Sequence, residues 1–123
     1  MKFKFTALLV LSLALTGCLS ATKMYDGNEL SDSKIAIIKG MNPSDPTIPK
    51  GWSAFVDSVD GIETPDNGAH IAILPGEHTL KVTCSAAGSP PKSHTLTEKF
   101  PAGSKYVIAT SAETDKCHLV RSK

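Results

Sequence analysis

Short apolar runs separated by turn residues are the feature that most constrains how this chain can fold. From residue 34 onward, no stretch of ten or more residues repeats apolar positions with the 3.6-residue period of an amphipathic helix. Seven runs have the length and the β-branched or alternating character of strands instead: 34–39, 52–59, 70–74, 78–85, 94–100, 105–110 and 117–121. Between them, Asp60-Gly61 and Pro75-Gly76 are pairs typical of tight turns.

These runs predict an all-β domain over residues 34–123, a small antiparallel β-sandwich of about seven short strands. We expect no parallel sheet, because parallel strands require long crossover connections, usually helical, and the sequence contains no such helix. A domain of this size is marginal without an additional constraint such as a disulfide or a metal.

The N-terminal residues have the pattern of an export signal. Two lysines within the first four residues precede an apolar run over residues 5–15. As a helix this run would span about 16 Å, roughly half of a bilayer core. Residues 1–17 are therefore expected to be a signal peptide, and not a transmembrane helix.

Leu15-Thr16-Gly17-Cys18 ends this run and resembles the lipobox of bacterial lipoproteins. The resemblance implies that Cys18 receives a diacylglycerol on its thiol, that cleavage occurs before it, and that its new amino group is acylated, for example with palmitate. One acyl chain anchors a protein only marginally, whereas two or three make a stable anchor. Leu19 follows, and the absence of Asp there favours the outer membrane by the same analogy. The alternative is a chance cysteine after an ordinary signal peptide.

Residues 18–33 are polar and lack sustained periodicity, so we expect a lipidated N-terminus followed by a flexible tether. As a coil, such a tether would place its ends on the order of 20 Å apart. Tyr25 and Leu30 are apolar side chains that could dock on the domain.

Cys84 and Cys117 are the cysteines that remain once Cys18 is lipidated. Each is predicted to share a strand face with apolar neighbours. In an exported, oxidising compartment they are expected to form a disulfide, with two free buried thiols as the alternative. The bridged strands would be neighbours in one sheet or would face each other across the core. Such a bridge would contribute roughly 3–4 kcal/mol in the chain-entropy model.

The charge and the aromatic content argue against a nucleic-acid partner. The chain has 13 Lys and Arg against 12 Asp and Glu, and removal of Lys2 and Lys4 with the leader leaves 11 against 12. Nucleic-acid-binding domains normally have a basic excess. Aromatic residues make up 6% of the chain, too few for a base-stacking surface.

Three segments follow one another in the chain: Val59-Asp60-Gly61, residues 73–82 (ILPGEHTLKV) and residues 101–108 (PAGSKYVI). Their order resembles the PEGA-type β-sandwich module, and small bacterial lipoproteins that carry a similar segment. The resemblance covers roughly residues 54–110, with an insert at 86–93 that departs from the pattern. It implies a compact β fold in the cell envelope and no catalytic residue.

No candidate active site or metal site stands out among the remaining polar residues. The four histidines are dispersed, and in the one close pair, Cys117-His118, adjacent strand residues point to opposite faces. No nucleophile, base and orienting group are found together. We therefore expect no enzymatic activity and no cofactor. Trp52 is expected either to pack on the core or to form a partner surface.

The sequence thus predicts a lipid-anchored protein of the bacterial envelope, facing the periplasm, with a non-enzymatic binding, accessory or structural role. Its expected contacts are the membrane, through the anchor, and an envelope protein partner. The alternative is a metal- or small-ligand-binding periplasmic module that uses histidines at strand ends.

Overall fold

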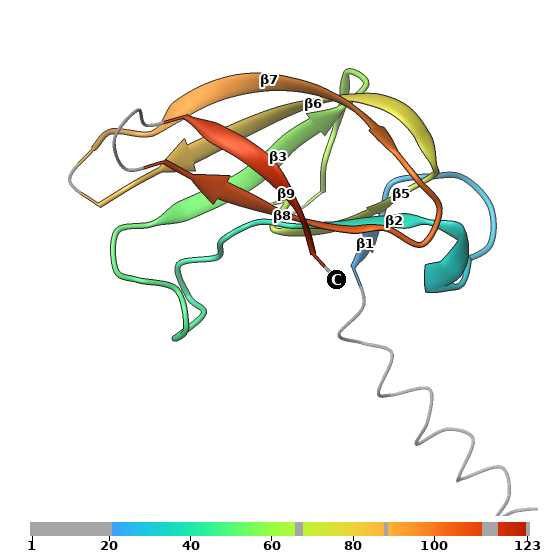
Figure 1. Cartoon of the computed structure of the whole chain (residues 1–123), viewed down its shortest axis with the longest axis horizontal. Coiled ribbons are helices and arrows are strands. Elements are labelled where there is room, and N and C mark those ends of the chain that lie inside the picture. Colours follow the sequence, from blue (N-terminus) through green and yellow to red (C-terminus); the bar gives the residue numbers. More distant parts are fainter. Residues whose placement is uncertain (1–20, 66–67, 88, 112–115, 123) are drawn as a thin grey trace, which may run out of the picture.

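The computed structural model describes residues 21–65, 68–87, 89–111 and 116–122. In these residues, nine strands form two sheets that pack face to face (Figure 1). The five-stranded sheet has the order β1 (Thr22–Lys23), β5 (His70–Ile73), β2 (Ala36–Lys39), β8 (Lys105–Thr110) and β9 (Cys117–Ser122). The four-stranded sheet has the order β4 (Ile62–Glu63), β3 (Ser53–Val59), β6 (Gly76–Ser85) and β7 (Lys92–Phe100). A short 3₁₀ helix, η2 (Asp32–Lys34), precedes β2.

The all-β sandwich and all seven predicted strands are confirmed. The observed strand ends differ from the predicted ones by at most two residues, because alternating or β-branched runs bounded by turn residues define strands locally. The sequence analysis missed β1 and β4. Each has only two residues, which is too short to show an alternating pattern.

The prediction of a purely antiparallel fold is wrong for the five-stranded sheet, which is mixed. β2 pairs with β8 in parallel, with Ile37 opposite Lys105, and β1 pairs with β5 in parallel, with Thr22 opposite Ile71. The crossover between β2 and β8 needs no helix. The chain passes through β3, β4, β6 and β7 of the other sheet, and through β5, before it returns, which is ample length for a parallel connection.

β1 lies within the segment predicted to be a tether and pairs with β5 of the five-stranded sheet. After β1, the amide of Met24 donates a hydrogen bond of 2.9 Å to the Ala72 carbonyl. The amide of Leu30 donates one of 3.0 Å to the Tyr25 hydroxyl. The predicted docking of Tyr25 and Leu30 is confirmed, because both side chains line a groove on the five-stranded sheet.

Both turn pairs have the backbone conformation that their residue types favour. Asp60 and Gly61 connect β3 to β4 with φ of 52° and 83°, the two positive values that a type I′ hairpin turn requires. Gly76 begins β6 with φ of 121°. A residue with a Cβ rarely adopts this conformation, so glycine is favoured here.

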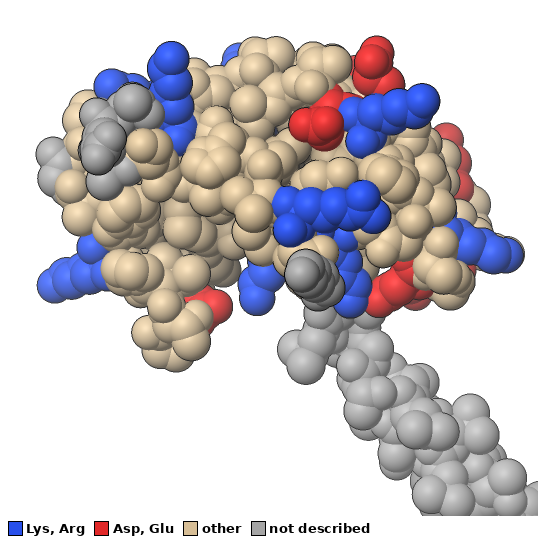
Figure 2. Space-filling view, viewed as in Figure 1, with Lys and Arg blue, Asp and Glu red and all other residues tan. Residues whose placement is uncertain are grey.

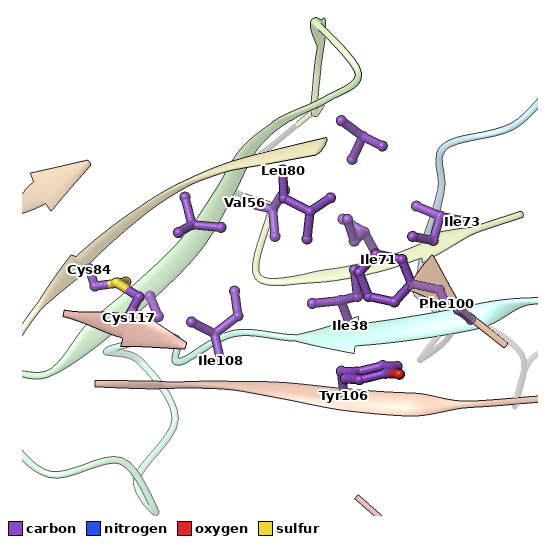
Figure 3. Close-up of a cluster of buried hydrophobic side chains, with 14 residues drawn as sticks. Ile38, Val56, Ile71, Ile73, Leu80, Cys84, Phe100, Tyr106, Ile108 and Cys117 are labelled. Atoms are coloured by element: carbon purple, nitrogen blue, oxygen red, sulfur yellow. A yellow bond between two sulfur atoms is a disulfide. The ribbon is translucent and has the colours of Figure 1, made fainter. Parts of the chain in front are cut away.

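The core lies between the sheets and receives side chains from both (Figure 3). The largest fully buried side chains are Phe100, Ile38, Ile71, Ile73, Leu80, Val56, Val82 and Cys84. The ring of Phe100 meets the ring of Tyr106 edge to face, with centroids 5.0 Å apart and an interplanar angle of 84°. This is a favoured aromatic arrangement, and it joins the end of β7 to β8 across the core.

A disulfide between Cys84 of β6 and Cys117 of β9 links the two sheets at one end of the core (Figure 3). Their Cα atoms are 6.3 Å apart, within the usual range for a disulfide. The predicted bridge is therefore confirmed. Of the two arrangements expected, the bridged strands adopt the one in which they face each other across the core.

Candidate binding groove

A groove of about 300 Å³ lies on the outer face of the five-stranded sheet. This volume is at the lower end of the range for small-molecule sites in proteins. All five strands of this sheet contribute to the lining, together with Ala21 and the segment between β1 and β2.

The floor of the groove is apolar. Ile37 of β2 stands opposite Ala72 of β5, and Val107 of β8 stands opposite Lys39. Strand side chains alternate between faces, so Ile37 lies on this outer face whereas Ile38 is fully buried in the core. The adjacent isoleucines of β2 therefore serve two different surfaces.

Lysines from the strands surround this floor. Lys39 stands opposite His70 on β5 and opposite Val107 on β8, and Lys105 stands opposite Ile37. Both are exposed. Within the described residues, neither ammonium group has a hydrogen-bond or ion-pair partner. Two hydrogen bonds from Thr47 lower the pKa of the Asp45 carboxyl, and the positive charge of Lys39 lowers it further.

Lys23 is held differently. Its ammonium donates a hydrogen bond to the Gly27 carbonyl and lies 5.4 Å from the centroid of the Tyr25 ring. The second contact has the geometry of a cation–π interaction. Lys23 therefore fastens the segment after β1, and Lys39 and Lys105 are the lysines available to a ligand.

His70 of β5 lines the groove beside Lys39 and is half-buried. Burial lowers the pKa of its imidazole, and the positive charges of Lys39 and Lys105 act in the same direction, whereas Asp32 opposes them. The ring is therefore neutral at physiological pH, with one nitrogen able to donate a hydrogen bond and the other able to accept one.

The segment between β1 and β2 also lines the groove. It contributes Tyr25, Leu30 and Ile35 together with the carboxylates of Glu29 and Asp32. The groove thus combines cationic strand residues with acidic residues of this segment, and the charge of Asp32 acts on His70 in the opposite direction to the lysines. In Figure 2, Lys and Arg side chains gather around the start of the described chain. Ala21, the first described residue, lines the groove.

A second polar cluster joins the β3–β4 turn to β6. The Asp60 carboxylate accepts hydrogen bonds from the Thr79 amide (2.8 Å) and from Nδ1 of His78 (2.6 Å). Nε2 of His78 lies 2.8 Å from the Leu74 carbonyl oxygen. The Thr79 and His78 hydrogen bonds lower the pKa of Asp60. Both ring nitrogens of His78 are occupied by these contacts, so this cluster fixes a turn and offers no free base.

Of the predicted site residues, Cys18 lies outside the described residues, and Trp52, Cys84 and Cys117 do not line the groove. Trp52 precedes β3, is half-buried, and lines neither the groove nor the buried core. The disulfide of Cys84 and Cys117 has a structural position.

The four histidines lie on four strands, with His70 on β5, His78 on β6, His94 on β7 and His118 on β9. The described residues contain no group of three or more His, Cys, Asp or Glu side chains placed to hold a metal ion. The metal-binding alternative thus stays a prediction.

The sequence analysis did not identify the groove. Its lysines and its apolar floor come from strands that are far apart in the chain and meet only through the parallel pairing of β2 with β8. The local signals are the two-residue spacings of Ile37 with Lys39 and of Lys105 with Val107, which place each pair on one strand face.

No family model, no curated protein and no solved structure matches this chain. The resemblance to the PEGA-type module stays a prediction. Within the described residues, no helix has the length and apolar character needed to cross a membrane.

Proposed function

We propose that this chain is a lipid-anchored protein of the bacterial envelope whose β-sandwich domain binds a ligand or partner at the membrane surface and catalyses no reaction. The observation that supports this proposal is the N-terminal segment up to Cys18. It has a basic start, a short apolar run and the lipobox-like Leu15-Thr16-Gly17. Leu19 supports the outer membrane, with the domain on the periplasmic side.

The position of β1 supports a domain held close to the membrane. β1 begins at Thr22, four residues after Cys18, and pairs with β5. Four extended residues span at most about 14 Å. A lipid on Cys18 would therefore hold the sandwich within this distance of the bilayer, much closer than a tether ending at residue 33 would allow.

The chemistry of the described polar groups supports binding rather than catalysis. Both ring nitrogens of His78 are occupied, by the Asp60 carboxylate and the Leu74 carbonyl oxygen, which leaves neither free to act as a base. The groove combines an apolar floor with a few charged side chains, which is typical of binding sites. Half-buried Trp52 is proposed as a separate surface for an envelope protein partner.

The relation to the PEGA-type module is also kept as a proposal. The type I′ turn at Asp60 and Gly61 and the positive φ of Gly76 agree with the segments that carry the resemblance. Turn chemistry alone would select the same residues, so these features support the resemblance without depending on common ancestry.

The experiment that tests the anchor compares Cys18→Ser with a Ser20→Ala control in cells fed radiolabelled palmitate. We expect label and membrane fractionation for the wild type and for Ser20→Ala, and neither for Cys18→Ser. Intact mass analysis of the purified protein should show cleavage before Cys18 and an added diacylglycerol with an amide-linked acyl chain. A Cys18→Ser protein that is still labelled and membrane-bound would overturn the proposal.

A further inference from the structure

We infer that the groove lined by Lys39, Lys105 and the apolar floor binds the anionic headgroup of a phospholipid in the membrane to which the chain is attached. This inference deepens the proposed function and rests on it for the location of the lipid. Binding of the headgroup can be measured whether or not Cys18 is acylated.

The first support is the position of the groove relative to the anchor. Ala21 lines the groove and is three residues after Cys18, a separation of about 11 Å at most. A lipid anchor on Cys18 would hold the mouth of the groove beside the headgroups. A phospholipid of the same bilayer would then be the most concentrated anion near the site.

The second support is charge complementarity. Lys39 and Lys105 are diagonal neighbours on the parallel strands β2 and β8, a relation that places backbones about 7–8 Å apart in a sheet. Their long side chains can converge on one phosphate from this distance. Neither has a partner in the described part of the chain, so binding would not require an existing ion pair to break.

The remaining lining decides which kind of anion fits. His70 is neutral and can donate one hydrogen bond to a phosphate oxygen. Ile37, Ala72 and Val107 can contact the glycerol and the first methylenes of the acyl chains. Glu29 and Asp32 also line the groove, and their negative charges would disfavour a large polyanion. The groove therefore suits one phosphate attached to an apolar body better than a nucleotide or a free multivalent ion.

The test uses the full chain in a non-ionic detergent and measures reductive methylation of each lysine by mass spectrometry. Short-chain phosphatidylglycerol, short-chain phosphatidylcholine and inorganic phosphate are titrated separately. We expect phosphatidylglycerol to protect Lys39 and Lys105 while Lys81 and Lys99, exposed on the other sheet, stay reactive. The protection should weaken as salt is raised.

Matched variants measure how much the two lysines contribute to phosphatidylglycerol binding. Each lysine at an anionic membrane surface contributes about 1 kcal/mol, or about fivefold in affinity. Lys39→Gln with Lys105→Gln should therefore weaken phosphatidylglycerol binding about 25-fold, whereas Lys81→Gln with Lys99→Gln should leave it within about twofold. All four side chains are exposed, so the variants should fold.

Three outcomes would overturn the inference: no protection of Lys39 and Lys105, equal protection by phosphatidylcholine, or equal protection by inorganic phosphate. The last would show a phosphate site without lipid recognition. Because the assay does not depend on acylation, it separates failure of this inference from failure of the anchor, which the palmitate experiment reports.

Discussion

Removal of the disulfide is the sharpest test of how this small sandwich is stabilised. The variant is Cys84→Ala with Cys117→Ala. The bridge joins β6 of the four-stranded sheet to β9, which in the described part of the chain is an edge strand of the other sheet and pairs with β8 alone. Loss of the bridge should therefore destabilise the whole domain and should release β9 in particular.

The magnitude follows from the length of the closed loop. The two cysteines are 33 positions apart, and the chain-entropy model converts this loop into about 3.7 kcal/mol at 25 °C. For a domain of this size, each kcal/mol changes the melting temperature by about 4–8 °C. The double variant should consequently melt about 15–30 °C below the wild type, and the lost free energy is a large share of the stability that a single domain normally has.

Urea unfolding gives the loss of free energy, and native-state hydrogen exchange locates it. The reduced wild type is the matched control, because it loses the bridge but keeps the sulfur atoms in the core. Amides of β9 should exchange faster in both, whereas those of β2, which lies between β5 and β8, should change only with global stability. A loss below about 1 kcal/mol, or equal acceleration in β2 and β9 under native conditions, would refute this account of the bridge.

Two further predictions concern the turns. Gly76→Ala should destabilise the domain by about 1–2 kcal/mol in urea unfolding, because φ of 121° strains any residue with a Cβ even though no atom lies within 4 Å of the added carbon; an unchanged midpoint would contradict this. Asp60→Asn keeps a residue that tolerates φ of 52° but removes the carboxylate that accepts the Thr79 and His78 hydrogen bonds. Folding lowers the pKa of Asp60, so its stabilisation is present above about pH 4 and is lost as pH falls through the folded pKa. At pH 7 the free energy of unfolding of the wild type should be at most about 1 kcal/mol larger than that of the variant, since the carboxylate is 47% exposed. This difference should disappear near pH 2 in pH-dependent unfolding. A difference that grows on acidification would show that the sign is wrong.

The sequence was most informative where a structural signal is local. Strand 78–85 alternates with a period of two, and Asp60-Gly61 is a residue pair that favours the type I′ turn without help from the rest of the chain. The disulfide partners were predictable because Cys18 was assigned to the anchor and only two cysteines remained. In each case, the prediction depended on a few neighbouring residues or on the number of cysteines.

The sheet pairing was not predictable in the same way. Nothing in residues 36–39 indicates that β2 lies beside β5 and β8, or that it is parallel to β8. Two-residue β1 forms only because β5 offers it an unpaired edge, and this pairing converts part of an expected tether into sheet. Backbone hydrogen bonds between distant segments depend little on which side chains the strands contain. The pairing of the strands is therefore set only when the whole chain packs.

The sequence by itself determined the all-β class, most strand positions and the turns, since each depends on the local pattern of apolar, β-branched and turn residues. Only the tertiary structure decided the mixed sheet, the pairing of β1 with β5 and the groove in which Lys39 and Lys105 come together. The physical reason is that Lys39 and Lys105 are separated by the strands of the opposite sheet in the sequence. They become neighbours only when the core buries its apolar side chains and brings β2 and β8 into one sheet.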